Sequence, residues 1–405
     1  MAPYDVAAVR AHFPALSGGT AFFDGPGGTQ TPDVVAEAVR DTLLGPLSNR
    51  GQVTDAEQRA DAVVVEARQA MAGLLGVDPA GVVFGRSMTA LTFDLARTLA
   101  RGWGPADAVV VSRLDHDANV RPWVLAAEAV GAEVRWIDFD PESSELRADH
   151  VTAVLDERVR LVALTGASNL LGTRPDLVAV AGLVHAVGAR LFVDGVHLTA
   201  HAPVDVAALG ADFYACSPYK FLGPHCGVLT AAPALLEQLH PDKLVPATDR
   251  VPERFEQGTL PYELLAGTTA AVDFLASLGG RGGDRRARVL AGMAAVEAHE
   301  DRLRRRLEEG LAALPGITVH SRARQRTPTL LLTFVETEPA EAYRFLAARG
   351  VNAPAGTFYA SEPARRLSLG ATGGLRVGLA PYTDEADVER LLDGLAAVQR
   401  SNRGF

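Results

Sequence analysis

Two segments, ARLFVDGVH (189–197) and ADFYACSPYKFLGPH (211–225), decide the fold class. Each begins with an apolar run of strand length; Asp194 closes the first run, and Lys220 lies in the turn-rich end of the second. Similar runs occur at 81–85, 107–112, 133–139, 159–166 and 227–231, and segments with helical spacing separate most of them. This alternation predicts an α/β fold with a mainly parallel sheet and helices on both faces. Ligands of such sheets bind beyond the carboxyl ends of the strands.

After about residue 260 the pattern changes. A long helical region is followed by the strand-like segments GITVHSR (316–322), TPTLLLTFV (327–335) and LRVGLAPY (375–382), with helical stretches between and after them. These predict a small α+β domain. We expect a large domain over 16–260 and a small domain made of 1–15 and 261–405.

Composition excludes several classes of protein. The 405 residues carry a formal net charge of -10, so nucleic acid is not an expected partner. Two cysteines cannot build a disulfide framework or a four-thiolate zinc site, and we expect no metal. The sequence has no secretion signal and no apolar run of membrane-spanning length, so we expect a cytoplasmic protein.

Amine chemistry is restricted to two positions. Of the 39 basic residues only Lys220 and Lys243 are lysines. Lys220 has apolar and aromatic flanks, which favour a neutral, nucleophilic amine, whereas Lys243 lies in a polar loop. Lys220 and Asp194 form the pair that pyridoxal phosphate (PLP) needs, an amine for the Schiff base and a carboxylate for the ring nitrogen. The alternatives are a solvated lysine and a turn aspartate.

Other polar residues follow neighbouring strands. Ser87 and Thr89 open a helix after the strand at 81–85, where backbone N–H groups and hydroxyls suit a phosphate. Ser217 supplies a second hydroxyl, three residues before Lys220. His116, after the strand at 107–112, is suited to stacking on a cofactor ring. Helix capping by the hydroxyls and a structural role for the histidine are the alternatives.

Together these segments resemble the class V aminotransferases of PLP fold type I, in their cysteine desulfurase-like branch. The resemblance covers nearly the whole chain and rests on FFDGPGGTQTP, SNRG, RSMTALTF, LDHDANVRPW, SNLLGT, FVDGVH, SPYKFLGPH, FEQGT and LRVGLAPYTDEADVERLL. It implies the PLP-dependent transferase fold of type I, with a mainly parallel, seven-stranded-type sheet and a small C-terminal α+β domain. It also implies a homodimer with shared active sites.

The resemblance assigns roles to individual residues. Lys220 carries PLP as a Schiff base, Asp194 pairs with the pyridine nitrogen and His116 stacks on the ring. Asn169 lies near the ring hydroxyl, and His197 stands where desulfurases often have glutamine. Phosphate contacts are implied for Ser87, Met88, Thr89, Ser217 and Tyr219, where Tyr219 replaces a histidine, and Thr259 reaches the partner subunit's phosphate. Arg376 clamps the substrate carboxylate and Tyr359 contacts the substrate. Asn49 and Arg50, with the glycine-rich FFDGPGGT near Asp24, lie in substrate-side loops.

The chain departs from the desulfurase pattern in one loop. Tyr359, in GVNAPAGTFYASEPARRLSL, is the nearest match to the reactive cysteine of persulfide-forming desulfurases. Cys216 and Cys226 are expected to be structural. We therefore expect Schiff-base and quinonoid chemistry on an amino acid, as an aminotransferase or a β-eliminating (C–S) lyase. The alternatives are an epimerase of the isopenicillin N epimerase type and a non-enzymatic PLP-fold binding module. The substrate is not specified by the sequence.

Overall fold

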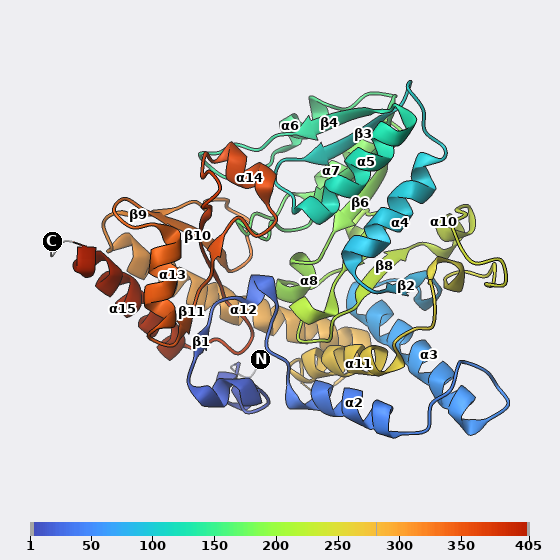
Figure 1. The fold of residues 1–405 in the computed structure, drawn as a ribbon, viewed down its shortest axis with the longest axis horizontal. Helices are drawn as coiled ribbons and strands as arrows, with labels where there is room; N and C mark the ends of the chain where they lie inside the picture. The colour runs from blue at the N-terminus through green and yellow to red at the C-terminus, as the bar shows by residue number, and fades with distance from the viewer. Residues whose placement is uncertain (1–3, 281, 403–405) are drawn as a thin grey trace.

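The structure is a computed structural model and describes residues 4–280 and 282–402 (Figure 1). Within these residues one sheet has seven strands in the order β2-β8-β7-β6-β5-β3-β4. β8 runs antiparallel to both neighbours, and the other pairs are parallel. This confirms the expected α/β fold. The strands are β2 (Val82–Gly85), β3 (Ala108–Ser112), β4 (Glu133–Ile137), β5 (Val159–Thr165), β6 (Arg190–Asp194), β7 (Phe213–Cys216) and β8 (Gly227–Ala231).

Helices cover both faces of this sheet, which explains why its strands are continuously apolar. Val109 and Val111 of β3 pack in one core with α4 (Met88–Ala100) and α5 (Arg121–Val130). Val110 points to the opposite core, with α3 (Asp55–Leu75), α7 (Leu177–Ala186) and α11 (Tyr262–Ser277). Shorter helices are α1 (Val6–Arg10), α6 (Ala148–Thr152), α8 (Leu198–His201), α9 (Val206–Leu209), α10 (Pro233–Glu237) and α14 (Ser361–Arg366).

A second sheet lies in the C-terminal part of the chain. Over the described residues it is antiparallel, with the order β12-β13-β10-β9. Leu330 and Leu332 of β10 share a buried core with Leu391 and Leu395. The strands of this sheet are β9 (Ile317–Val319), β10 (Thr329–Phe334), β12 (Ala355–Gly356) and β13 (Gly374–Gly378). The helices of this part of the chain include α13 (Pro339–Ala347) and α15 (Glu385–Asn402).

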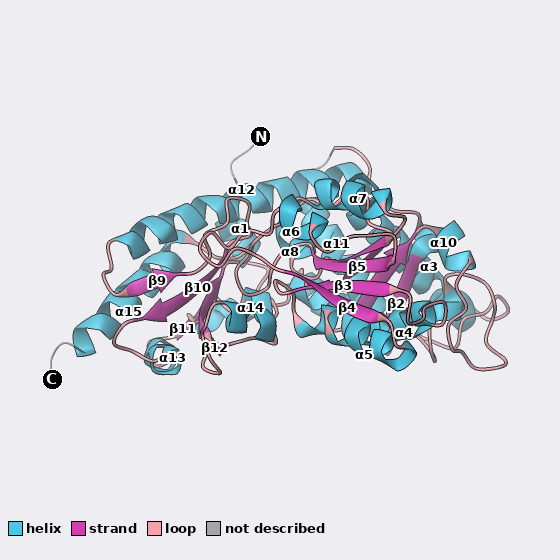
Figure 2. Ribbon diagram, turned by 90° about the horizontal axis from the view of Figure 1, so that it is seen from above, coloured by secondary structure: helices cyan, strands magenta, loops and turns pink. Residues whose placement is uncertain are grey.

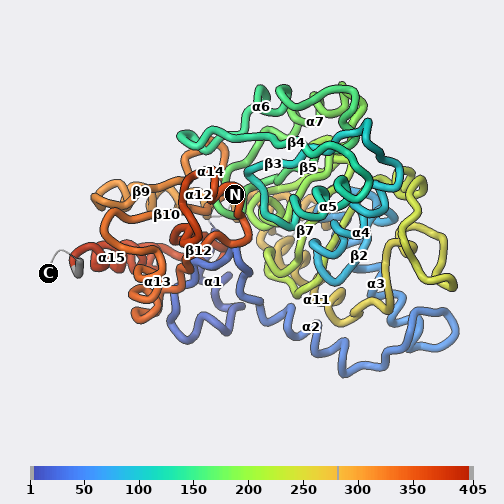
Figure 3. Tube along the Cα trace, turned by 45° about the horizontal axis from the view of Figure 1, so that its top comes forward, coloured from blue at the N-terminus to red at the C-terminus, as the bar shows by residue number. Residues whose placement is uncertain are grey.

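The N-terminal segment lies beside this C-terminal part (Figure 3). Strand β1 (Ala21–Phe22) pairs in parallel with β11 (Val351–Asn352), and Arg10 forms ion pairs with Asp387 at 2.7 Å and Asp384 at 3.2 Å. Conversely, α11 packs against α2 (Asp33–Leu44) and α3. Packing therefore crosses both ends of the predicted 16–260 segment, and the boundaries at 15/16 and 260/261 stay a prediction.

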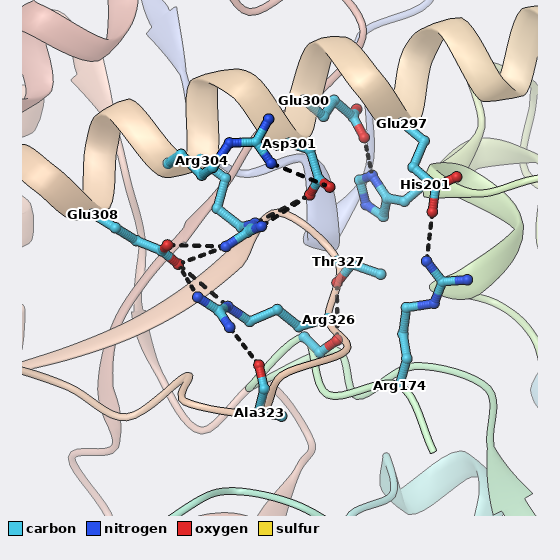
Figure 4. Close-up of polar contacts among 12 residues, drawn as sticks. Arg174, His201, Glu297, Glu300, Asp301, Arg304, Glu308, Ala323, Arg326 and Thr327 are labelled. Atoms are coloured by element: carbon cyan, nitrogen blue, oxygen red, sulfur yellow. Dashed lines mark hydrogen bonds and ion pairs between the residues drawn. The ribbon is translucent and has the colours of Figure 1, made fainter. Parts of the chain in front are cut away.

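The 28-residue helix α12 (Arg285–Ala312) runs along both sheets (Figure 2). Its Glu308 pairs with Arg304 and Arg326, and its Glu297 pairs with Arg174 at 2.6 Å (Figure 4). Arg326 also forms a β-bridge with Thr173. The loop after β5, which carries Asn169, is thus held against the second sheet. No helix in the described ranges is long and apolar enough to cross a bilayer.

Candidate active site

A cavity of about 610 Å³ lies where the carboxyl ends of β5, β6 and β7 face the second sheet. Twelve of the fifteen side chains predicted for the site line it: Ser87, Met88, Thr89, His116, Asn169, Asp194, His197, Ser217, Tyr219, Lys220, Tyr359 and Arg376. They come from segments up to 289 residues apart (376 − 87), so the fold brings them together.

Lys220 ends a single 3₁₀ turn, Pro218–Lys220, directly after β7. Its Nζ donates a hydrogen bond to the main-chain carbonyl of Pro26 and lies 4.8 Å from the centroid of the Tyr219 ring. Burial, reinforced by the positive charge of Arg376, lowers the pKa of the Lys220 amine to about 7, although Asp194 opposes the shift. A large share of this amine is therefore neutral near pH 7 and is a nucleophile or base.

Asp194 is the last residue of β6 and is 5% exposed. Its Oδ1 accepts a hydrogen bond from the Val196 N–H at 2.9 Å. Burial raises the pKa of its carboxyl to about 6, although the Val196 N–H and Lys220 favour the anion. A buried carboxylate with a free oxygen gains from a cationic partner, which a protonated ring nitrogen supplies.

His116 caps a short turn that follows β3. Its Nδ1 accepts a hydrogen bond from the Ala118 N–H at 3.0 Å, which places the ring proton on Nε2. Burial, together with Lys220 and Arg376, lowers the pKa of the imidazole to about 4, so the ring is neutral at pH 7. The Tyr359 ring lies 5.6 Å away, tilted by 35°.

The start of α4 suits an anion, because its first backbone N–H groups have no partner within the helix. Ser87 is the N-cap and accepts a hydrogen bond from the Ala90 N–H at 3.1 Å, while the N–H groups of Met88 and Thr89 precede the first intrahelical bond. Gly227 of β8 packs beneath this turn. A Cβ added to Gly227 would lie 2.4 Å from the Met88 nitrogen, so glycine allows the close approach.

Arg376, on β13, is 3% exposed and has free hydrogen-bonding capacity. One terminal nitrogen donates to the Asn169 main-chain carbonyl at 3.2 Å, and the guanidinium lies 3.7 Å from the centroid of the Phe358 ring. Its Nε is buried without a hydrogen-bond partner among the described residues. Burial lowers the pKa of Arg376 to about 9, although Asp24 favours the cation. An underused, buried guanidinium suits a substrate carboxylate.

His197 joins the two sheets at the cavity wall. Its Nε2 lies 3.0 Å from the hydroxyls of both Thr327 and Thr329. The ring of His201 stands edge-on behind it at 4.7 Å, and the Nδ1 of His201 hydrogen bonds to the buried Glu300 at 2.9 Å (Figure 4). Burial, with His201 close by, lowers the pKa of His197 well below its usual value, so the ring is neutral.

The chain's two thiols lie away from the cavity. Cys216 and Cys226 are 0% and 2% exposed, and burial raises the pKa of both, that of Cys226 to about 11. At the cavity mouth stands Tyr359 instead, 77% exposed. Tyr359 and Phe358 both have positive φ, 56° and 54°, a strained turn that presents the two rings at the site.

Three predicted residues do not line this cavity. Arg50 forms ion pairs with Asp61 at 2.8 Å and Glu253 at 3.2 Å, and Asn49 and Thr259 are exposed. Their roles in substrate binding and toward a partner subunit stay predictions.

Several lining residues were not predicted from the sequence, among them Phe93, Asp117, Arg121 and Phe358. Each of them lies close in sequence to a predicted residue, which could have indicated it. Phe93 lies one helical turn after Thr89, Asp117 and Arg121 follow His116 by one and five residues, and Phe358 directly precedes Tyr359. Pro26, which holds Lys220 through its carbonyl, lies in the glycine-rich FFDGPGGT segment, but its contact with Lys220, 194 residues later, has no local signal.

Comparison with known proteins agrees with this geometry. Residues 21–391 match the family model described as Aminotransferase class-V. The chain belongs to the class V aminotransferase family. This makes it a PLP-dependent enzyme of the cysteine desulfurase-like kind, as the sequence predicted.

Relatives cover nearly all of this class V enzyme. It is 32% identical to the uncharacterized protein MT3887 of Mycobacterium tuberculosis, over 98% of this chain and 99% of the relative. It is 31% identical to a cysteine desulfurase of Klebsiella pneumoniae, with the same coverage. The crystal structure of the Escherichia coli cysteine desulfurase CsdA matches with a TM-score of 0.86 at 28% identity, over 98% of this chain and 99% of that one.

The residues of this class V enzyme fit PLP. The uncapped N–H groups of α4 suit the phosphate, and Asp194 suits a protonated ring nitrogen. The Nδ2 of Asn169 donates a hydrogen bond to the Phe358 carbonyl at 3.0 Å, while its Oδ1 is buried without a hydrogen-bond partner among the described residues. A ring hydroxyl would satisfy this acceptor. Lys220 would supply the amine.

Proposed function

We propose that this class V enzyme is a β-eliminating lyase for an amino acid with a leaving group on its β-carbon, and that it loads no sulfur onto itself. The observation that carries the proposal is the position of the thiols. Cys216 and Cys226 are buried with raised pKa values, and Tyr359 stands at the cavity mouth. A thiol that is buried and protonated cannot attack a substrate sulfur.

Each residue assigned to the site has its own role in the proposed reaction. PLP, when bound, supplies a ring that stabilises negative charge at the substrate α-carbon. Arg376 binds the substrate carboxylate, which fixes the α-carbon relative to Lys220. With PLP bound, the neutral amine of Lys220 would take the α-proton, and the carboxylate of Asp194 would keep the ring nitrogen protonated. His116 would remain a neutral imidazole at the cavity wall and add no charge to the site.

A product assay tests the reaction class. The PLP-loaded enzyme is given L-cysteine and then other amino acids singly, with and without a keto-acid acceptor. We expect keto acid and ammonia in equal amounts without an acceptor, with sulfide from L-cysteine. Acceptor-dependent turnover without ammonia would show an aminotransferase instead. Alanine together with a protein-bound persulfide would show a desulfurase.

We also propose that the enzyme works as a homodimer. Leu43, Leu44 and Val53 near α2, and Leu244 and Val245 in the loop after α10, are apolar and 61–97% exposed. Apolar side chains of this kind suit an interface between copies. Analytical ultracentrifugation is expected to give twice the chain mass of 42.7 kDa, and a monomeric, fully active enzyme would contradict the proposal.

A further inference from the structure

A second arginine lines the cavity near its mouth. Arg121 is the first residue of α5, and its side chain is 54% exposed, whereas Arg376 is buried. Tyr359, the exposed ring at the mouth, lies beside the same segment, because the Asp117 N–H donates a hydrogen bond to the Tyr359 carbonyl at 2.8 Å. The cavity therefore has one guanidinium in its interior and one at its opening.

The guanidinium of Arg121 is only weakly engaged by the described part of the chain. One of its terminal nitrogens lies 3.6 Å from the Asp117 carboxylate, which is longer than a hydrogen bond, and the two side chains are 54% and 37% exposed. An exposed ion pair of this kind contributes little stability. A guanidinium has several N–H donors, and no hydrogen bond to another described residue uses them. Arg121 is therefore free to bind an anion in the cavity.

A cation at the start of α5 does not stabilise the helix. The N-terminal end of a helix carries partial positive charge, which repels an arginine in the first turn. The N-cap residue, Val120, makes no side-chain hydrogen bond to the helix, and Asp117 is the one carboxylate that pairs with Arg121 over the described ranges. The positive charge of Arg121 and of the helix end thus exceeds the single negative charge of Asp117. An anion at the cavity mouth gains from this excess.

We propose that Arg121 is a specificity-determining residue that binds a second carboxylate, at the far end of the substrate side chain. This inference rests on the proposed function and deepens it, because it gives the leaving group a chemical class: one that carries a carboxylate. Arg376 then holds the α-carboxylate in the interior, and Arg121 holds the distal carboxylate at the mouth. The rings of Phe93 and Phe358, which line the same cavity, suit the methylene groups between the two charges.

Dicarboxylates without an amine test this arrangement without catalysis. Succinate, glutarate and adipate are titrated into the PLP-loaded enzyme by calorimetry, each beside its monoamide, which has nearly the same shape but lacks the second charge. The natural protein is expected to bind at least one dicarboxylate about 10-fold more tightly than its monoamide, and Arg121→Gln is expected to bind the two about equally. Equal affinities in the natural protein, or an unchanged preference in Arg121→Gln, would overturn the proposal.

Arg305→Gln is the matched control, because Arg305 forms a similar pair on α12, outside the described lining of the cavity. It lies 3.9 Å from Asp301, four residues earlier, and its side chain is 60% exposed. This variant is expected to keep the preference for dicarboxylates. Asp117→Asn removes the carboxylate that competes for Arg121, so it is expected to tighten dicarboxylate binding about 2- to 5-fold. Loss of the preference in Arg305→Gln, or unchanged or weaker dicarboxylate binding in Asp117→Asn, would contradict the role of Arg121.

Turnover separates this inference from the proposed function. S-(Carboxymethyl)-L-cysteine and its neutral amide analogue, S-(carbamoylmethyl)-L-cysteine, are given to the natural enzyme and to Arg121→Gln. Elimination breaks the Cβ–S bond, consumes one water and yields pyruvate, ammonia and a thiol, and the thiol is measured. KM is expected to be about 10-fold lower for the carboxylate than for the amide in the natural enzyme, and similar for both in Arg121→Gln.

The two kinds of failure differ. If dicarboxylates are preferred but neither conjugate releases a thiol, the lyase function fails while the binding role of Arg121 stands. If both conjugates release their thiols with equal KM in the natural enzyme, the lyase function stands and the role of Arg121 is overturned.

Discussion

The side-chain amine of Lys220 donates a hydrogen bond to the main-chain carbonyl of Pro26, 194 residues earlier in the chain. This contact places the amine at the cavity wall, out of bulk water and close to Arg376, and burial lowers its pKa to about 7. The neutral amine is the form that attacks an aldehyde. The rate at which the cofactor-free protein combines with PLP is therefore expected to rise with pH and level off above about 7.

Stopped-flow absorbance between pH 5.5 and 10.5 measures this rate. A midpoint near 10.5, the ordinary value for lysine, would contradict the buried position of Lys220.

Arg376→Gln removes the proposed carboxylate clamp. A hydrogen bond to a charged group contributes about 1.5–3 kcal/mol, so KM for the amino acid is expected to rise by about 10- to 150-fold, with a smaller change in kcat. Steady-state kinetics check the split. Arg324→Gln, an exposed arginine on the loop before β10, is the control and should leave both constants unchanged. An unchanged KM in Arg376→Gln would remove the clamp from the account.

Gly227→Ala tests the phosphate site without touching a polar side chain. The added Cβ would lie 2.2 Å from the Ser87 carbonyl carbon, so the start of α4 must shift. Weaker PLP binding is expected in an equilibrium titration. Gly182→Ala, in the exposed part of α7 with nothing within 4 Å, should leave PLP binding intact and stabilise the helix by about 1 kcal/mol.

The buried ion pair between Arg68 and Glu256 is predicted to stabilise the fold. Arg68 pairs with both oxygens of the Glu256 carboxylate at 2.8 Å and is 6% exposed. Arg68→Met leaves Glu256 buried without its cation, which costs about 3–5 kcal/mol in the free energy of unfolding. Urea denaturation measures the loss. Arg40→Met, which breaks the exposed pair with Asp41, should change stability by less than about 1 kcal/mol. Equal losses in both variants would contradict the assignment.

Local patterns predicted the framework of the site. The apolar runs at 190–194 and 213–216 are central strands, and Asp194 and Lys220 lie at their carboxyl ends as expected. This works because a buried parallel strand needs a continuous apolar run, which is visible in sequence.

Long-range contacts were not predictable in the same way. β1 and β11 are two residues each, too short for any periodicity, and their pairing joins residues 330 positions apart (351 − 21). The buried acid Asp115 reads in sequence like the half-buried acid Asp117 two residues later. Only the packing of Asn119 and Trp123 around Asp115 distinguishes them. The placement of Arg50 in ion pairs, away from the cavity, likewise depends on Glu253, 203 residues later.

The most direct test asks which lysine carries the cofactor. The natural protein, Lys220→Ala and Lys243→Ala are incubated with PLP, reduced with borohydride and mapped by peptide mass spectrometry. Lys243 is the matched control, because it is the only other lysine and pairs with Asp249 in a loop. We predict a reduced PLP adduct on Lys220 in the natural protein and in Lys243→Ala, and none in Lys220→Ala. An adduct on Lys243, or no adduct in the natural protein, would contradict the account.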